Sequence, residues 1–257
     1  VVTADEEADT VTVLAGVGDG SLRQGQAFAA DSQPFWVGIA DLTEDGQPDI
    51  VMLSHTTAGF QFRRNRGRLD FGGTAQVVRA DTVSSPNAAA LADLDGDGRI
   101  DVTVTSGSGR VVFFRNTGGG TFDGGTPIGP MGIGPSQLQP ADLDGDGHIE
   151  VAVVADAIVQ ILSPRAGATA ASVGTSLVSW NVAVAVLRTG QSVKDLVVSG
   201  TDSRISVILG KGDGTFAEPA LTDVGGSLPF SVVGGDFDRD GKLDLATLNQ
   251  GTGTLSL

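Results

Sequence analysis

Short stretches of alternating apolar and polar residues recur in a fixed order along this 257-residue chain. In DVTVTS, residues 101–106, apolar valines alternate with polar side chains, which is typical of a β-strand. An apolar run, usually entered through a proline, precedes each such strand, and another apolar run with a glycine-rich hairpin follows it. The related strands are DIVMLS (49–54), EVAVVA (150–155), DLVVSG (195–200) and DLATLN (244–249). This order predicts an all-β chain of repeated units.

An acidic loop between the first and second strand marks each unit. The first acid of the loop is Asp41, Asp93, Asp142 or Asp236, and the last of these intervals is about twice the others. A degenerate copy at 187–195 lies midway, so the units are spaced by 52, 49, 45 and 49 residues. A period near 50 residues indicates a solenoid, a propeller or another array. Four antiparallel strands per unit are the content of one propeller blade.

We therefore expect residues 1–257 to form a single β-propeller domain of four-stranded antiparallel blades. Residues 1–22 align with residues 197–216, which places the first residues in the second strand of a blade. The last residues, GTLSL, fall in a third strand. Six blades, with an incomplete first and last one, use every strand once. We expect six or seven blades in the complete protein, with five as the alternative.

The acidic loops have the spacing of a cation site. In the loop 93–101, carboxylates fall at positions 1, 3, 5 and 9, and glycines at positions 4 and 6 allow a tight turn. Carboxylates crowded in this way repel one another unless a cation lies among them, and Ca²⁺ is the hard cation that such oxygen ligands prefer. By comparison with the EF-hand, position 7 supplies a backbone carbonyl. The candidate ligands are Asp41, Thr43, Asp45, Gln47 and Asp49; Asp93, Asp95, Asp97, Arg99 and Asp101; Asp142, Asp144, Asp146, His148 and Glu150; and Asp236, Asp238, Asp240, Lys242 and Asp244.

We expect about four Ca²⁺ ions with a structural role. The bidentate Glu at position 12 of the EF-hand is absent, so the acid at position 9 replaces it. The alternative is a carboxylate-rich turn that binds no ion, and it has most weight in the loop 41–49, where Thr43 replaces an acid. Mg²⁺ fits less well because it retains waters and a rigid octahedron. The degenerate loop keeps Asp195 but has Leu187, Thr189 and Gln191 at positions 1, 3 and 5, so no ion is expected there.

The charge of the chain follows from these loops. The net charge is −15, and the candidate ligand positions of the four loops hold 15 of the 31 acidic residues. A chain without a basic field is not expected to bind nucleic acid. With no cysteine, disulfides, thiolate metal sites and a Cys nucleophile are excluded. No run approaches 18 apolar residues, so we expect no membrane insertion.

Three runs of sequence resemble a known family. GDFDRDGKLDLATLN (235–249), ADLDGDGRIDVTV (92–104) and ILGKGDGTF (208–216) are similar to the FG-GAP/VCBS repeats of integrin α-chain propellers, secreted bacterial proteins and fungal lectins. The resemblance implies a non-catalytic, calcium-binding module at the cell surface or in the extracellular space, which mediates adhesion by recognising a protein or a carbohydrate. The alternative that it leaves open is an accessory or catalytic domain of a polysaccharide-active lyase or hydrolase.

The face opposite the calcium loops is the expected place for a partner. Connections of an up-and-down blade alternate ends, so the acidic loops and the glycine-rich hairpins share one face. The candidate ligand-binding residues of the opposite face are Trp36, Trp180, His55 and Phe230. Their rings suit stacking on a sugar, and the alternative is packing between blades. Neither histidine has a Ser or Cys partner at a recognisable spacing, so no catalytic residue is expected.

A cluster of arginines stands apart from the acidic pattern. FQFRRNRGRLD contains Arg63, Arg64, Arg66 and Arg68, a quarter of the 16 basic residues. A solvated outer strand is the ordinary explanation for such a run, and contact with an acidic glycan is the alternative.

Overall fold

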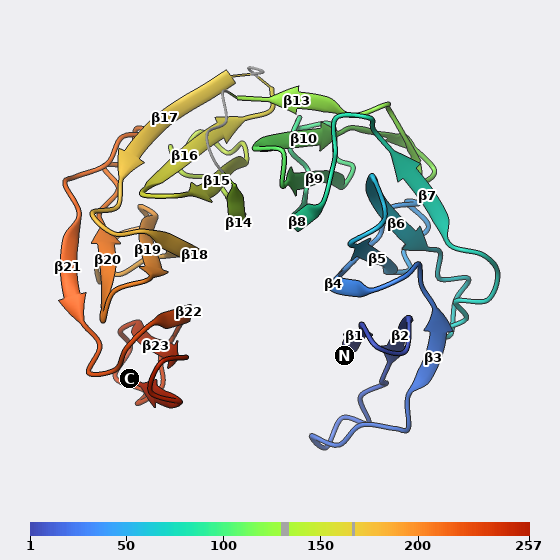
Figure 1. The fold of residues 1–257 in the computed structure, drawn as a ribbon, viewed down its shortest axis with the longest axis horizontal. Coiled ribbons are helices and arrows are strands. Elements are labelled where there is room, and N and C mark those ends of the chain that lie inside the picture. The colour runs from blue at the N-terminus through green and yellow to red at the C-terminus, as the bar shows by residue number, and fades with distance from the viewer. Residues whose placement is uncertain (130–133, 166–167) are drawn as a thin grey trace. The chain divides into compact units, whose positions relative to one another are not determined.

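The computed structural model describes residues 1–129, 134–165 and 168–257, and within them the chain forms 24 β-strands and no helix (Figure 1). The all-β fold class is therefore confirmed. Over the same residues, no helix is long and apolar enough to span a membrane.

Apart from one two-stranded hairpin, the described strands form six sheets that follow one another along the chain, and we number them as blades 1 to 6. Four of them have four strands, and blades 1 and 6 have three. Blade 1 is β1 (Val2–Asp5), β2 (Thr10–Val13) and β3 (Gln26–Ala29); blade 2 is β4 (Pro34–Ala40), β5 (Asp49–Ser54), β6 (Gly59–Arg63) and β7 (Gln76–Arg79); blade 3 is β8 (Pro86–Ala92), β9 (Asp101–Ser106), β10 (Arg110–Phe114) and β13 (Thr126–Ile128). Blade 4 is β14 (Pro135–Ala141), β15 (Glu150–Ala155), β16 (Ile158–Ser163) and β17 (Ala168–Gly174); blade 5 is β18 (Ser179–Ala185), β19 (Asp195–Gly200), β20 (Arg204–Ile208) and β21 (Ala220–Asp223); blade 6 is β22 (Pro229–Gly235), β23 (Asp244–Asn249) and β24 (Thr254–Ser256).

The order of strands agrees with the expected phase of the repeat. Within each of blades 2, 4 and 5, consecutive strands pair in sequence order, and the register of each pairing is antiparallel. A small hairpin, β11 (Asn116–Gly118) and β12 (Thr121–Phe122), extends the connection between the third and fourth strands of blade 3. Blade 1 has no strand in the first position and blade 6 none in the fourth, as the alignment of the ends predicts.

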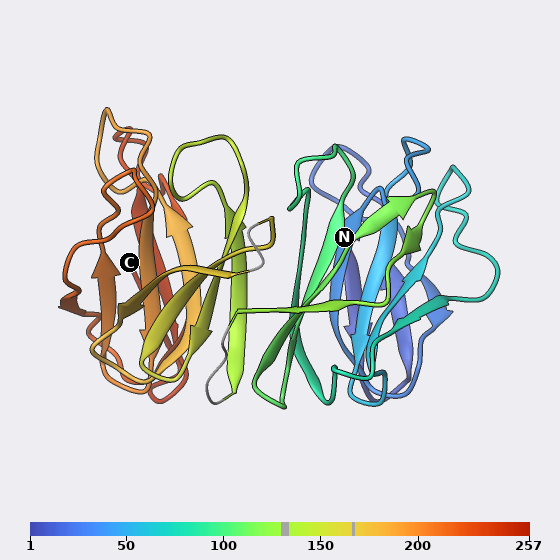
Figure 2. The ribbon, with the colours of Figure 1, turned by 90° about the horizontal axis from the view of Figure 1, so that it is seen from above.

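The chain divides into two compact units, residues 1–93 with 97–127 and residues 94–96 with 128–257. In each unit, hydrophobic clusters join consecutive blades. The first unit has one cluster between blades 1 and 2 and one between blades 2 and 3; the second has one between blades 4 and 5 and one between blades 5 and 6. Face-to-face packing of successive sheets is the packing of propeller blades. Figure 2 shows the strands of each unit running between loops at two opposite ends.

The second strands of blades 2 to 5 are buried along their whole length. Every residue of β5, β9, β15 and β19 is buried. The polar positions of β9 are included, and the Thr105 hydroxyl accepts a hydrogen bond from the Ala88 amide at 2.9 Å. The alternation seen in the sequence therefore does not separate a core face from a solvent face, because both faces of these strands pack within the blade stack.

A β-bulge recurs near the start of the first strand. In five blades the register of the pairing with the second strand shifts at the second residue of the first strand. These second residues are Phe35, Asn87, Ser136, Trp180 and Phe230. Bulges bend a strand and redirect a side chain. The five bulges lie at the end of each first strand that is far from its acidic loop.

Candidate functional site

The four acidic loops share one hydrogen-bond pattern, which follows from their sequence. The position 1 carboxylate accepts a hydrogen bond from the amide of the glycine at position 6, at 2.8 Å for Gly46 to Asp41 and 3.1 Å for Gly241 to Asp236. The amide at position 7 donates to the carboxylate at position 5. Positions 4 and 6 have positive φ in all four loops. Each loop therefore curls its side-chain oxygens toward a common centre.

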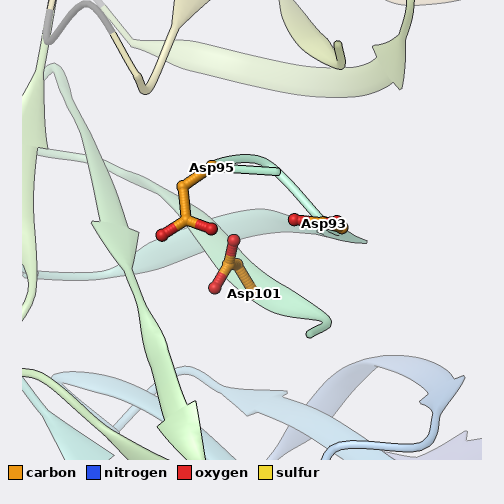
Figure 3. A group of neighbouring side chains, drawn as sticks. All are labelled: Asp93, Asp95 and Asp101. Carbon is orange, nitrogen blue, oxygen red and sulfur yellow. The ribbon is translucent and has the colours of Figure 1, made fainter. Parts of the chain in front are cut away.

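Three of the loops bring three carboxylates together. In the described residues these groups are Asp93, Asp95 and Asp101; Asp142, Asp144 and Asp146; and Asp236, Asp238 and Asp244. One oxygen from each member lies within 4.8 Å of the others. Oxygen ligands about 2.3–2.6 Å from a Ca²⁺ ion lie at most about 5 Å from one another, so the geometry fits this ion. Figure 3 shows Asp93 and Asp95 on the loop, with Asp101 facing them.

The position 5 carboxylate behaves differently among the loops. Asp97 pairs with Arg99 and, at 3.3 Å, with Arg115. In the loop 142–150 the corresponding Asp146 joins the carboxylate cluster instead. The longer Glu150 at position 9 of that loop accepts the Leu143 amide at 3.0 Å. The groups that converge are therefore positions 1, 3 and 9 in two loops and positions 1, 3 and 5 in the third.

The position 9 carboxylate connects each loop to the rest of its blade. Asp49 is fully buried and accepts amide hydrogen bonds from Leu42 at 3.0 Å and from Asn65 at 2.8 Å, the latter in the hairpin after the third strand. Burial raises the pKa of Asp49. Burial, together with the nearby aspartates of its loop, also raises the pKa of Glu150. A divalent cation would offset this cost of burying negative charge.

The loop 41–49 contains an independent sign of a missing ligand partner. The Thr43 side chain is buried, and its hydroxyl makes no hydrogen bond of normal geometry. The same hydroxyl faces the Asp45 and Asp49 carboxylates at hydrogen-bonding range. A cation held by these three side chains would bind the hydroxyl oxygen together with the two carboxylates. The residues present thus fit Ca²⁺ in this loop as well.

The backbone shape of the loops gives a first prediction. Arg239 occupies position 4 with φ 66, where Gly145 has φ 81 in the loop 142–150. We expect Arg239→Gly to raise the free energy of unfolding by about 0.5 kcal/mol, because glycine adopts this conformation without steric strain. Gly145→Ala should lower it by about 1 kcal/mol. Urea unfolding in Ca²⁺ measures both, and two neutral substitutions would show that the left-handed conformation is not required.

The degenerate loop differs from its expected alignment by one residue. Ala185 pairs with Asp195 as the residue before position 1 pairs with position 9 in the other blades, so Val186, and not Leu187, is in position 1. The Leu187 amide donates to Asp195 at 3.1 Å, as position 2 does elsewhere. The Arg188 guanidinium donates to the same carboxylate at 2.6 Å. This loop is one residue longer than the others, and an arginine provides its positive charge.

The candidate ligand-binding residues occupy different environments. Trp36 packs against the core cluster of blades 2 and 3. His55 stacks on Phe35 with ring centroids 4.4 Å apart, and its Nε2 lies 3.7 Å from a Glu6 carboxylate oxygen. Trp180 and Phe230 lie 6.0 Å apart, and Phe230 is 52% exposed.

Sequence reasoning missed a groove beside that last pair. It has a volume of about 320 Å³, and the first strands of blades 4, 5 and 6 line it. Its polar residues are Gln137, Gln139, Asn181 and Ser231. Asn181 and Ser231 directly follow the bulged Trp180 and Phe230, and the Asn181 Oδ1 atom is buried without a hydrogen-bond partner. The available signal in the sequence was the polar residue at the third position of these first strands, Gln137, Asn181 and Ser231.

Comparisons with known proteins agree with this architecture. A structure of a lectin from Agrocybe aegerita, described as recognising non-reducing terminal N-acetylglucosamine, aligns with a TM-score of 0.67 and 22% identity over 97% of this chain and 73% of its own. BBS1N in complex with ARL6DN aligns with a TM-score of 0.64 and 14% identity over 96% and 73%. The V. cholerae biofilm matrix protein Bap1 aligns with a TM-score of 0.56 and 21% identity over 92% and 41%. No curated protein matches the sequence.

The family model for FG-GAP-like repeats matches residues 93–153 and 190–247. These segments include the acidic loops 93–101, 142–150 and 236–244. With the blade architecture and the propeller neighbours, they identify the chain as a β-propeller that carries FG-GAP-like repeats.

Proposed function

We propose that this protein is a non-catalytic, extracellular propeller module that binds Ca²⁺ in four loops and recognises a glycan through the bulged ends of its first strands. The observation that carries the glycan assignment is the groove of blades 4 to 6. Its lining combines amide and hydroxyl side chains with apolar ones and includes no charged residue. Amides both donate and accept hydrogen bonds, which matches the hydroxyl groups of a neutral sugar.

An aromatic platform beside the groove supports the same assignment. Phe230 is half exposed, it is next to Ser231 in the strand, and its ring lies 6.0 Å from that of Trp180. Exposed aromatic rings next to polar groups are typical of binding sites, because they provide a large contact area at a small entropic cost. The lectin among the structural neighbours recognises a sugar, which is consistent with a glycan ligand here.

The groove does not favour the enzyme alternative. Glycoside hydrolysis ordinarily needs two carboxyl groups on either side of the scissile bond. None of the residues that line this groove is acidic or a histidine. Ca²⁺, held by the side chains of positions 1, 3, 5 and 9, would act structurally by neutralising the loop carboxylates. Modules with weak calcium sites require the millimolar Ca²⁺ of the extracellular space, which is the basis for the proposed location.

A pair of phenylalanine substitutions tests this proposal. Phe230→Ala should reduce binding on a glycan array or in calorimetry by roughly tenfold, a typical loss for an aromatic residue at the centre of a site. Phe237→Ala is the matched control, because Phe237 is 51% exposed but lies in the acidic loop at the other end of the same strand. Equal binding by both variants would remove the groove from the proposal. If the folded protein binds no glycan in Ca²⁺, a protein partner takes its place.

A further inference from the structure

A cavity of about 310 Å³ lies in blade 2, between the end of β6 and the start of β7. Its lining residues are Arg63, Arg64, Arg66, Phe71, Gly72, Thr74 and Gln76. Three of these seven are arginines and none is acidic, in a chain with 16 basic and 31 acidic residues. The local charge of this cavity is therefore opposite to that of the protein.

Arg63 is a buried cation that no carboxylate neutralises. It is 8% exposed, and its guanidinium donates to the backbone carbonyls of Ala29, Phe71 and Gly73. Among the described residues, no acidic side chain forms an ion pair with it. Burial also lowers the pKa of Arg63. Carbonyl oxygens orient the group but do not balance its charge, and an unbalanced buried charge is costly.

The other two arginines leave donors available to a ligand. Arg64 is about half exposed and pairs with Asp45 at 3.1 Å through Nη2. A guanidinium has five N–H donors, so this pair occupies only part of them. The Arg66 side chain is exposed, and within the described chain it has no ion pair. Asp70, the acid of the same hairpin, accepts the Gly72 amide at 2.9 Å and does not line the cavity.

Backbone shape keeps the cavity open on the side of Arg66. Gly73 has φ 99, and a Cβ atom at this position would lie 2.8 Å from the Nη2 atom of Arg66. A larger residue would be strained at this φ and would displace the end of the Arg66 side chain, so glycine favours this position of the arginine against the hairpin. Thr74, just before β7, adds a hydroxyl donor, and Gln76, the first residue of β7, adds an amide donor.

We propose that this cavity is an oxyanion-binding site for a sulfate or carboxylate group, such as an acidic sugar carries. Guanidinium groups match the planar and tetrahedral oxyanions through paired hydrogen bonds, and charge-assisted bonds of this kind are the stronger ones. The site lies in the first compact unit, on the hairpin side of blade 2, and does not depend on the groove of blades 4 to 6.

Titration with sodium sulfate at constant ionic strength, followed by two-dimensional NMR, tests the site. The amide signals of Gly72, Gly73 and Thr74 should shift and saturate with sulfate but not with chloride. Arg66→Gln should weaken this binding roughly tenfold, as expected for the loss of a charge-assisted contact. Arg68→Gln removes the same charge from the same hairpin at a residue that does not line the cavity, and it should change binding less than about twofold.

Titrations with a sulfated, a uronic-acid and a neutral disaccharide would show whether the bound anion is carried by a sugar or is free in solution. Tighter binding of either acidic disaccharide than of inorganic sulfate supports a glycan as the carrier, and equal binding assigns the site to the free anion. The absence of a saturable shift overturns the proposal. Equal weakening by Arg66→Gln and Arg68→Gln also overturns it, because a diffuse positive field would then account for the effect.

Discussion

Removal of calcium is expected to lower the melting temperature of this protein by several degrees or more. At millimolar Ca²⁺ and a Kd of about 10⁻⁴ to 10⁻³ M, each site stabilises the folded state by roughly 0.4–1.4 kcal/mol. Four sites together would contribute a few kcal/mol, which is a large fraction of the usual net stability. In a chain of this size, each kcal/mol shifts the melting temperature by about 2–4 °C.

Differential scanning calorimetry in 1 mM Ca²⁺ and in excess EDTA would measure the shift, and native mass spectrometry would count the ions. Asp93→Asn should remove one ion and reduce the shift, because Asp93 belongs to a convergent cluster. Asp81→Asn removes the same charge from an exposed turn, and this variant should still bind the full number of Ca²⁺ ions. A melting curve that is identical with and without chelator would show that the loops do not hold calcium.

The acidic loops were predictable because their information is local. Spacing at alternate positions and glycines at positions 4 and 6 determine both the turn and the convergence of Asp93, Asp95 and Asp101. The order of the strands was predictable for a similar reason, because each unit repeats the same local sequence patterns in the same order. The number of strands in the incomplete first and last blades could therefore be inferred from an alignment of the chain with itself.

The aromatic residues were less predictable because one bulge changes which side chains face the core. The register skips Phe35, and both Phe35 and Trp36 pack against the cluster of blades 2 and 3. In a regular strand, consecutive side chains point to opposite faces, so a shift of one residue changes the face that a side chain occupies. Since a bulge depends on pairing with the next strand, the sequence of β4 alone does not show that two consecutive rings contact one cluster. The position of Arg63 in its cavity likewise depends on backbone carbonyls outside β6. Gly73 is 10 residues from Arg63 in the sequence, and Ala29 is 34 residues from it.

The degenerate loop shows how a blade keeps a buried carboxylate without metal ligands. The Asp195 side chain is 0% exposed, and it accepts the Gly210 amide at 3.0 Å, as the corresponding Asp49 accepts Asn65. Its counter-charge comes from Arg188, whose Nη2 atom also donates to the Gly210 carbonyl at 2.7 Å. The guanidinium thus connects the loop to the end of the third strand, which is the connection that a calcium ion would reinforce in the other blades.

Substitution of this arginine should therefore be strongly destabilising. Arg188→Gln leaves Asp195 buried without a counter-charge, and we expect a loss of about 3–5 kcal/mol in the free energy of unfolding, as measured by urea denaturation. Arg204→Gln is the matched control, because the pair of Arg204 with Asp202 is exposed to solvent and should contribute little to stability. Asp195→Asn in the Arg188→Gln background should recover part of the loss by removing the unpaired charge.

The same variants separate the arginine from the calcium sites. If Arg188 supplies the charge of its own loop, the deficit of Arg188→Gln should be the same in Ca²⁺ and in EDTA, because no ion replaces the guanidinium. A deficit that disappears in Ca²⁺ would mean that the loop 186–195 binds the ion although Asp195 is its only acidic residue. Equal, small effects of Arg188→Gln and Arg204→Gln would instead show that hydrogen bonds from backbone amides alone stabilise the buried Asp195 carboxylate.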